Sequence, residues 1–570
     1  MKLVVLALLF LGTLMAQDKS SAAPDTIYIN GNVWTGTKLD FVSGKNHYLA
    51  INRAQAFAVK GDRILAVGTN DAIEKLKGAK TVVVDLGGKF VMPGFNDAHL
   101  HLSGGGFEKL NVDLVGTKSI AEMKQRIAER AKSTPQGAWV LGRGWDHTKW
   151  TEQVLPTRQD LDQVTAGHPA FFSRVDGHIA VANSAALKAA GIDRNTKSPQ
   201  GGAIDHDAQG EPTGILRDAA MGLMKVIPPP TPAQVRKAME LALEDAAQWG
   251  LTSLQSQLLD NKEWEDFLVC EDLEREGKLT ARVTMWLPFD APLADLQRWR
   301  AHHPATDPML HTGMLKAYMD GSLGSRTSAM RQPFADDPRN TGLAQWDQQK
   351  LNQYAIERVM AGFQLGFHAI GDRGADMALN AFEAAQSYAR EHNADGKRAH
   401  FRNRIEHDQV IEPDQFARYK ELGVIASVQP NHLLTDMNWA ESRLGPERAK
   451  WSYPWREFLK SGVVLAFGTD YPVEPLTPFR GIYAAITRKN EAGTGAYFPG
   501  QKLTIDEALA AYTIDAAFAD FAEKEKGTLA KGMLADFVIL DRDLTKIPPQ
   551  EILGTKVLRT VVGGKTVFNQ

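Results

Sequence analysis

The sequence predicts an α/β protein: a (β/α)8 barrel with a β-sandwich built from both termini and one inserted subdomain. Both ends of the chain carry short strand-like runs joined by tight turns. Between them, from 89 to about 520, short apolar runs alternate with helical segments, which is typical of parallel strands with crossover helices. This span is longer than the roughly 250 residues of a plain barrel, so an insertion is expected.

The two ends are expected to share one domain. Residues 24–88 contain short apolar runs, two of which flank the turn Lys60-Gly61-Asp62-Arg63 as in a β-hairpin. Residues 521–570 contain a similar hairpin around Gly563-Gly564. Neither end has enough strands for a well-covered sheet. A single β-sandwich assembled from both is therefore the economical prediction.

The barrel is assigned to residues 89–520. Its eight strands are predicted at 89–95, 252–258, 281–287, 314–319, 364–368, 403–407, 424–428 and 463–467. The excess length lies between the first two strands, at about 105–235, and ends near the break Pro228-Pro229-Pro230. An insertion at this place commonly forms a lid or a specificity element over the barrel mouth.

The composition favours a globular protein that acts on small molecules. The 570 residues are 43% hydrophobic and 23% charged, and the net charge is −3 with both signs interleaved. This pattern provides no electrostatic footprint for nucleic acid or an anionic membrane, so a small-molecule substrate is the expected partner. The oligomeric state is not fixed by the sequence, and a homodimer is compatible with it.

The N-terminus is typical of a secretory signal peptide. Lys2 precedes an apolar run from Leu3 to about Leu14, and cleavage is expected near Ala16 or Ala23, so residues 1–23 are assigned to the signal. The run is too short to span a bilayer in the mature protein. We therefore expect export to the periplasm or the medium. The single cysteine, Cys270, excludes intramolecular disulfides and is expected to be buried.

A His-x-His motif organises the candidate site. In an extended strand, Asp97, His99 and His101 point the same way, and two imidazoles on one face can chelate a metal. An isolated motif of this kind is more often a pair of surface histidines or of hydrogen-bonded core histidines. Asp97 is a candidate either for orienting a ligand or for an ordinary strand-end hydrogen bond.

Four residues downstream favour the metal reading. Lys316 lies inside the fourth predicted strand, His368 and His407 end the fifth and sixth, and Asp470 follows the eighth. Barrel enzymes place their chemistry at the carboxyl ends of these strands. Histidine and carboxylate groups converging there predict a metal site.

At this point the chain resembles the amidohydrolase superfamily, and in particular its family 3 branch, which includes the N-substituted formamide deformylase-like proteins. The matching motifs cover nearly all of residues 26–569. They are Pro93-Gly94-Phe95-x-Asp97-x-His99-x-His101, Gly142-x-Gly144-Trp145-Asp146, Gly177-His178 with Asn183-Ser184, Asp320 to Thr327, His368 to Asp372, Ile405-Glu406-His407, Gly468 to Pro472 and Lys531 to Asp536.

The resemblance implies a binuclear site. His99 and His101 would hold one divalent metal, His368 and His407 a second, and Lys316, as a carbamate formed with CO2, would bridge the two. Asp470 would ligate the first metal and act as general base and acid. The metals are expected to be two zinc ions, although Fe, Mn, Co or Ni suit the same ligands. A lysine ammonium is disfavoured in a dry barrel beside cations, which is consistent with the carbamate; pairing with Asp320 is the alternative.

The predicted function is hydrolysis of a carbon–nitrogen bond other than a peptide bond, in an amide, formamide or cyclic amide. Two alternatives stay open: a mononuclear deaminase-like enzyme and a metal-containing binding protein without turnover. The mononuclear enzyme needs a carboxylate beside its metal. Glu406 precedes His407 and is expected to point to the other side of the strand, which counts against it.

Six residues are candidates for substrate binding, each with a structural alternative. An arginine near acids commonly pairs with them, and an isolated tryptophan is commonly in a core. The candidates are His178 in the insertion, Arg326 and Arg373 after the metal strands, Gln429 and His432 beyond the seventh strand, and Trp145.

Overall fold

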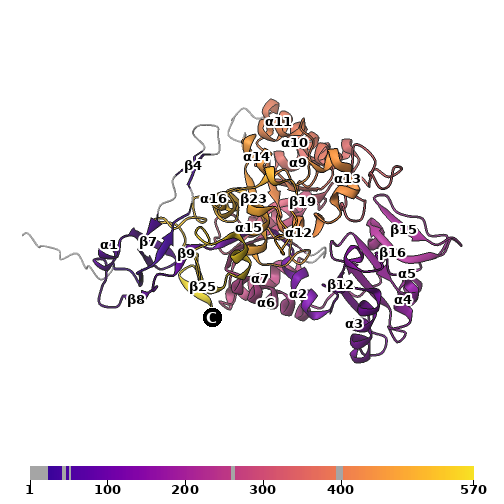
Figure 1. Ribbon diagram of the computed structural model, residues 1–570, viewed down its shortest axis with the longest axis horizontal. Helices are drawn as coiled ribbons and strands as arrows, with labels where there is room; N and C mark the ends of the chain where they lie inside the picture. The colour runs from indigo at the N-terminus through magenta and orange to yellow at the C-terminus, as the bar shows by residue number, and fades with distance from the viewer. Residues whose placement is uncertain (1–22, 37, 41–46, 50–52, 259–263, 393–401) are drawn as a thin grey trace, which may run out of the picture.

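The structure is a computed structural model that describes residues 23–36, 38–40, 47–49, 53–258, 264–392 and 402–570. Apart from residue 23, the predicted signal peptide lies outside the described residues. Figure 1 shows a central barrel with the inserted subdomain on one side and the terminal sheets on the other. Within the described ranges, no helix is both long and apolar enough to cross a membrane.

Eight parallel strands form the barrel, and their order in space is their order along the chain. Nearly every strand residue is buried, because one face meets the barrel interior and the other meets the helices. The predicted (β/α)8 barrel is therefore confirmed. Its strands are β10 (Phe95–Leu100), β17 (Leu251–Gln257), β18 (Arg282–Pro288), β19 (Leu310–Tyr318), β20 (Leu365–Ala369), β21 (Arg404–His407), β22 (Ile425–Val428) and β23 (Leu465–Phe467).

The first barrel strand was predicted wrongly at 89–95. Residues 90–93 form β9 (Phe90–Pro93), which pairs with strands of the terminal sheet, and β10 begins only after Gly94. A Cβ atom on Gly94 would lie 2.2 Å from the side chain of Thr252. Because only glycine fits there, the chain can step at this point from the terminal sheet into the barrel.

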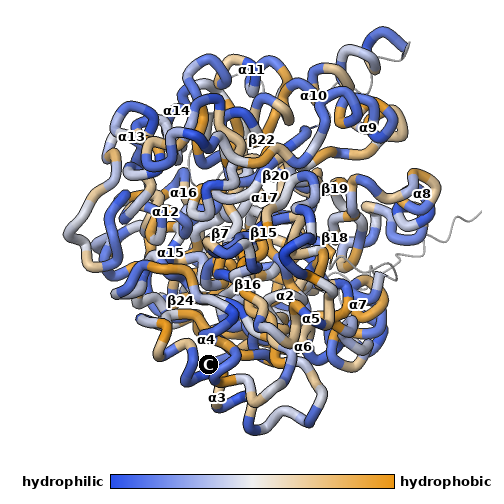
Figure 2. The backbone as a smooth tube through the Cα atoms, turned by 90° about the vertical axis from the view of Figure 1, so that its right-hand side faces the viewer, coloured by the Kyte–Doolittle hydropathy of each residue, from blue (hydrophilic) through white to orange (hydrophobic). Residues whose placement is uncertain are grey.

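Helices surround the strands, as the end-on view in Figure 2 shows. The apolar face of the longest helix, α10, packs towards the strands, with Ala378, Phe382 and Ala385 buried. The covering helices are α6 (Pro232–Gln248), α7 (Glu265–Arg275), α8 (Leu293–His302), α9 (Gln348–Met360), α10 (Asp372–His392), α11 (Gln415–Leu422), α12 (Asn431–Asp436), α13 (Ala440–Ala449), α14 (Trp455–Lys460), α15 (Pro478–Thr487), α16 (Ile505–Ala511) and α17 (Ile514–Ala519).

The terminal segments form two sheets that pack on each other, as predicted. The rings of Tyr28 and Phe57 lie on the four-stranded sheet and contact Phe537 of the six-stranded sheet at 5.1 and 5.0 Å between centroids. The first sheet has the order β7 (Arg63–Gly68), β6 (Ala56–Lys60), β1 (Thr26–Ile29), β8 (Val82–Asp85); the second has β26 (Lys565–Asn569), β25 (Val557–Val562), β24 (Phe537–Leu540), β9, β2 (Asn32–Trp34), β5 (Arg53–Ala54).

The inserted subdomain leaves the barrel after α2 (Leu102–Leu110) and returns at α6, whose start is fixed by the Thr231 cap and Pro232. It has a sheet and a hydrophobic core of its own. Its elements are β11 (Val112–Asp113), α3 (Ile120–Ser133), β12 (Val140–Trp145), α4 (Arg158–Asp162), β13 (Ala170–Arg174), β14 (Ile179–Ala182), α5 (Ser184–Ala190), β15 (Gly202–His206) and β16 (Pro212–Asp218).

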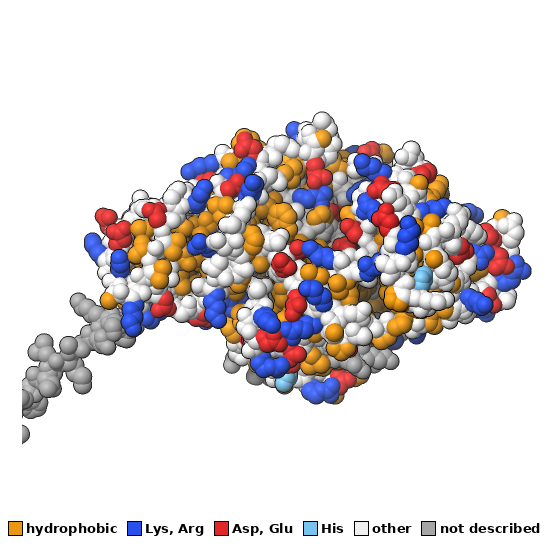
Figure 3. Space-filling model, turned by 90° about the horizontal axis from the view of Figure 1, so that it is seen from below, with side chains coloured by type: hydrophobic (Ala, Val, Ile, Leu, Met, Phe, Trp, Pro, Cys, Tyr) orange, Lys and Arg blue, Asp and Glu red, His pale blue; other side chains and the backbone are white. Residues whose placement is uncertain are grey.

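The insertion docks on the loops at the carboxyl ends of the barrel strands. The Ser322 hydroxyl donates a hydrogen bond to Asp176 at 2.6 Å, and the Gln345 amide donates to the Gly201 carbonyl at 3.0 Å. The insertion therefore covers the mouth of the barrel. Figure 3 shows one face of the whole molecule, on which acidic and basic side chains are interspersed.

Candidate metal centre

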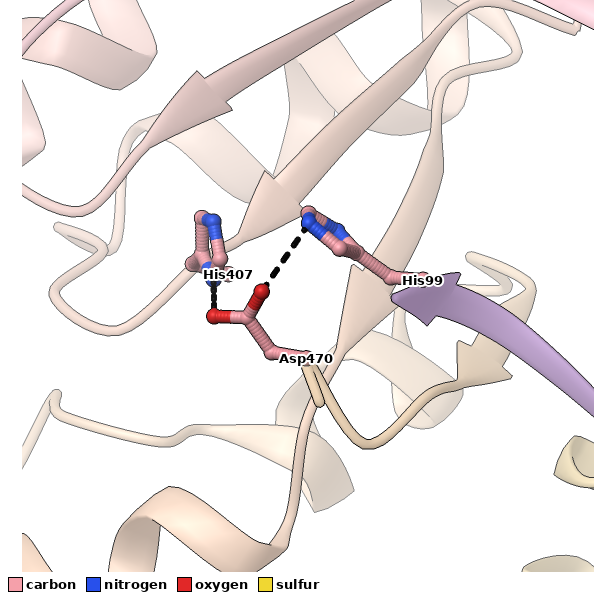
Figure 4. Close-up of side chains that lie close together, drawn as sticks. All are labelled: His99, His407 and Asp470. Carbon is pink, nitrogen blue, oxygen red and sulfur yellow. Dashed lines mark ion pairs between the residues drawn. The ribbon is translucent and has the colours of Figure 1, made fainter. Parts of the chain in front are cut away.

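Five barrel strands bring the predicted ligands together. His99 lies on β10, Lys316 on β19, His368 on β20 and His407 on β21, while Asp470 follows β23. Figure 4 shows His99 and His407 facing the Asp470 carboxylate. One potential ligand atom from each of these three residues lies within 4.8 Å of the others.

The Asp470 carboxylate has the geometry of a metal ligand. Its Oδ1 atom lies 3.3 Å from Nε2 of His99 and 3.2 Å from Nε2 of His101. The atom is buried, yet within the described part of the chain it accepts no hydrogen bond of acceptable geometry. Burial lowers the pKa of His99 to about 4, so this imidazole is a neutral donor at pH 7. Two imidazoles and a carboxylate around one buried point suit a divalent cation.

The backbone around Asp470 is held in an uncommon conformation. Asp470 has a φ of 59° and His407 a φ of 84°, both in the left-handed region that non-glycine residues rarely adopt. Asp97 supports this arrangement by accepting hydrogen bonds from the backbone N–H groups of His99 at 3.1 Å and Thr469 at 3.0 Å. Asp97 thus links the ends of β10 and β23. Of the two roles predicted for it, the strand-end hydrogen bond is the one that these contacts show.

The side chain of Glu406 corrects the sequence analysis. It does not point away from the site: Oε2 lies 2.7 Å from Nδ1 of His99, and both side chains are fully buried. Burial alone would raise the pKa of Glu406, but Arg404, at 2.8 Å, and the contact with His99 lower it to about 2. Glu406 is therefore an anion that fixes the His99 ring with Nε2 towards Asp470.

Lys316 is a buried amine beside the same histidine. Its Nζ lies 3.3 Å from Nε2 of His99, and burial lowers its pKa to about 8, although Glu406 and Asp470 oppose the shift. The alternative partner, Asp320, instead accepts backbone hydrogen bonds from Ala329, Ile370 and Gly371. A neutral amine, the form that reacts with CO2, is thus accessible near pH 8.

His368 and His407, the two ligands predicted for a second metal, lie side by side. Their ring centroids are 4.4 Å apart, and burial holds the pKa of each well below its ordinary value. Nε2 of His368 lies 3.1 Å from the Gly321 carbonyl, and Nδ1 of His407 lies 2.8 Å from Oε1 of Gln429. A neutral imidazole that donates a hydrogen bond from one nitrogen to an oxygen keeps its other nitrogen free to ligate a metal. Gln429, predicted to bind substrate, therefore orients His407 instead.

A cavity of about 360 Å³ opens over the centre. The barrel contributes His101, His368, His407 and Asp470 to its wall, and the insertion contributes residues 143, 146 and 174–178. A cavity of this size accepts a small organic molecule.

Two predicted substrate residues line this cavity. His178 lies 2.7 Å from Asp218, and Nε2 of His432 lies 3.2 Å from Oδ2 of Asp470. Burial would lower the pKa of each imidazole, but the neighbouring carboxylates raise it to about 9. Both groups are cationic at neutral pH in the absence of a metal.

Three predicted substrate residues lie elsewhere. Trp145 is fully buried in the core of the insertion and donates to the Phe172 carbonyl. Arg326 pairs with Asp336 at 2.9 Å, the commoner fate of an arginine near acids. Arg373 is exposed at the start of α10. None of the three is part of the cavity wall.

Sequence comparison gives the family. The chain matches the sequence model described as the amidohydrolase family over residues 82–568. It is 34% identical to Protein LONG AFTER FAR-RED 3 of Arabidopsis thaliana, covering 95% of this chain and 91% of that protein. It is 30% identical to the N-substituted formamide deformylase of Arthrobacter pascens, covering 95% and 97%.

Comparison with a solved structure gives the same result as the sequence comparison. An uncharacterized metal-dependent hydrolase from Pyrococcus horikoshii superposes with a TM-score of 0.72 at 28% identity, over 92% of this chain and 99% of that one. Three observations point to the same family. They are the barrel, the buried histidines and carboxylate at its mouth, and the match over most of the sequence. The chain belongs to the amidohydrolase family of metal-dependent hydrolases.

Proposed function

We propose that this protein is a binuclear metal-dependent hydrolase of a non-peptide carbon–nitrogen bond, in an amide, formamide or cyclic amide. The observation that carries the proposal is the buried Oδ1 atom of Asp470. It faces Nε2 of His99 and His101 and accepts no good hydrogen bond from the residues that the structure describes. The similarity to a formamide deformylase supports the bond type.

The chain offers candidate ligands for two divalent metals. Zinc is the ion we expect, and the same histidine and carboxylate ligands also suit Fe, Mn, Co or Ni. His99, His101 and Asp470 would hold one, His368 and His407 the other, and a carbamate on Lys316 would bridge them. Bound divalent metal supplies Lewis-acid chemistry, acidifying water and polarising a carbonyl group.

Asp470 would move the proton. In the proposed reaction a water oxygen bonds to the substrate carbonyl carbon, the carbon–nitrogen bond breaks, and Asp470 carries the water proton to the departing nitrogen. Asp470 lines the cavity wall, and its Oδ2 atom lies 3.2 Å from Nε2 of His432. The products are a carboxylic acid and an amine.

The mononuclear alternative receives less support from the geometry. It requires a carboxyl group that exchanges protons beside a single metal, and Glu406 is the nearest additional candidate. Glu406 contacts the Nδ1 side of His99 and pairs with Arg404, and these partners lower its pKa to about 2. Glu406 is also not among the described residues that line the cavity, whereas Asp470 is, so Glu406 lacks the access to a substrate that a proton carrier needs.

The test measures metal per polypeptide in wild type and in Lys316→Ala, with the exposed Lys420→Ala as control. We expect about two metals in wild type and the control and fewer in Lys316→Ala. Hydrolysis of N-formylbenzylamine should stop when a chelator strips the protein, with its circular dichroism unchanged. One metal in every variant would select the mononuclear enzyme, and hydrolysis by the stripped protein would refute both.

A further inference from the structure

The charged groups on the cavity wall are mostly neutralised within the protein. Arg174 pairs with Asp146 and Asp176 at 2.6 Å each, and Glu474 pairs with Arg480 at 3.0 Å. These groups therefore have little charge left for a ligand.

Arg143 differs from its neighbours on this wall. Its Nη2 atom donates to the Val175 carbonyl, but its Nε atom is buried and donates to no acceptor among the residues that the structure describes. In the same described part of the chain, no carboxylate oxygen lies within ion-pair distance of its guanidinium. A buried cationic donor without an acceptor is costly, and a ligand that supplies the acceptor recovers that free energy.

The backbone is built to deliver this side chain. Arg143 lies near the end of β12, where the register with β13 shifts between Arg143 and Trp145. Gly144 has a φ of 100°, and a Cβ atom there would lie 2.5 Å from the Val115 side chain; one on Gly142 would lie 2.5 Å from the Val112 carbonyl. The irregular strand turns Arg143 to the cavity while Trp145 stays in the core.

The acidic neighbour of Arg143 does not cancel its charge. Glu108 interacts with it electrostatically but lies beyond ion-pair distance, and burial raises the pKa of Glu108 to about 7. Glu108 is therefore only partly ionised at neutral pH. A net positive guanidinium faces the cavity that the metal ligands also line.

We propose that Arg143 binds a carboxylate of the substrate and so selects N-acylated or N-formylated amines that carry an acid group, such as N-acyl amino acids. A guanidinium fork matches the two oxygens of a carboxylate. This inference deepens the proposed function and rests on it. It assigns to Arg143 a substrate-binding role in place of Arg326 and Arg373, which were the arginines predicted to bind substrate.

The test uses a probe that binds without reacting. In 4-oxo-4-phenylbutanoate a methylene group replaces the nitrogen of N-benzoylglycine, so no scissile carbon–nitrogen bond remains; its carboxamide is the neutral isostere. Calorimetry on the metal-loaded protein should show the carboxylate binding about 10- to 100-fold more tightly than the carboxamide in wild type. Arg143→Gln should reduce this preference to about threefold or less, whereas Arg143→Lys should retain most of it.

The exposed Arg373→Gln is the matched control and should keep the wild-type preference. A preference that survives Arg143→Gln would assign the anion to another group and overturn the inference, as would equal binding of the two probes by wild type. The wild-type comparison needs no variant to fold. Hydrolysis of N-benzoylglycine is measured separately: Arg143-dependent binding without hydrolysis would refute the proposed reaction and leave the carboxylate site standing.

Discussion

Replacing Glu406 by Gln tests how firmly the protein holds His99. The Glu406 carboxylate lies 2.7 Å from Nδ1 of His99, and neither side chain is exposed to solvent. Glutamine keeps the size but removes the charge and offers only one acceptor oxygen. Since partners of this kind orient metal-binding histidines, we expect metal affinity to fall about 10- to 100-fold.

The same substitution should lower stability. Arg404 loses its buried counter-charge at 2.8 Å, and breaking a buried pair costs about 3–5 kcal/mol. Arg404 keeps hydrogen bonds to the Ala98 carbonyl at 2.6 Å and to Ser427 at 2.8 Å. These contacts place the expected loss near the lower end, about 3 kcal/mol.

Two measurements separate the effects. Competition with a chelator gives the metal affinity, and urea denaturation of the metal-free protein gives the free energy of unfolding. Glu421→Gln, on the exposed side of α11, is the control and should change neither quantity. If Glu406→Gln loses stability while its metal affinity stays within about twofold of wild type, the orienting role assigned to Glu406 is wrong.

Three further substitutions probe other parts of the argument. Asp470→Asn should reduce kcat about 10²- to 10⁴-fold in steady-state assays while the fold persists. Lys526 and His311 outweigh burial and lower the pKa of Asp520. The ionised Asp520 therefore stabilises the folded protein above the unfolded-state pKa of about 3.9, and this contribution is lost as the pH falls below that value. Urea denaturation should show that Asp520→Asn lowers the free energy of unfolding more at pH 7 than at pH 3. Trp145→Ala should cost about 3–5 kcal/mol by thermal or urea unfolding; a changed substrate preference without lost stability would contradict its core placement.

The barrel, and the convergence of the candidate ligands at its mouth, were predictable because both follow from local features of the sequence. Each strand that carries a candidate ligand is short, and each candidate ligand except Lys316 lies near or just beyond a strand end. Since the strands follow one another in chain order, no long-range pairing had to be guessed. The bounds of the first barrel strand were predicted wrongly because the apolar character of the sequence continues through Pro93-Gly94. The pairing partner of the chain nevertheless changes there from β24 to β17.

Glu406 was missed for a different physical reason. Counting alternate sides along a strand assumes extended backbone, and this places Glu406 opposite His407. Glu406 in fact shares the inward face with Arg404, two residues earlier, and both are buried there. His407 reaches the same interior because its φ of 84° breaks the extended conformation at the strand end. A left-handed histidine has no sequence signature that separates it from an extended one.

The cavity wall was the least predictable part, because it depends on how two separately packed units meet. Trp145, Arg143 and Asp146 are close neighbours in sequence, yet the first belongs to the core of the insertion and the other two to the wall. The candidate metal ligands all come from the barrel, whereas Arg143 and His178 come from the insertion. Substitutions on the insertion wall can therefore change the substrate while the barrel retains its metal ligands, which is the division of labour expected of barrel enzymes.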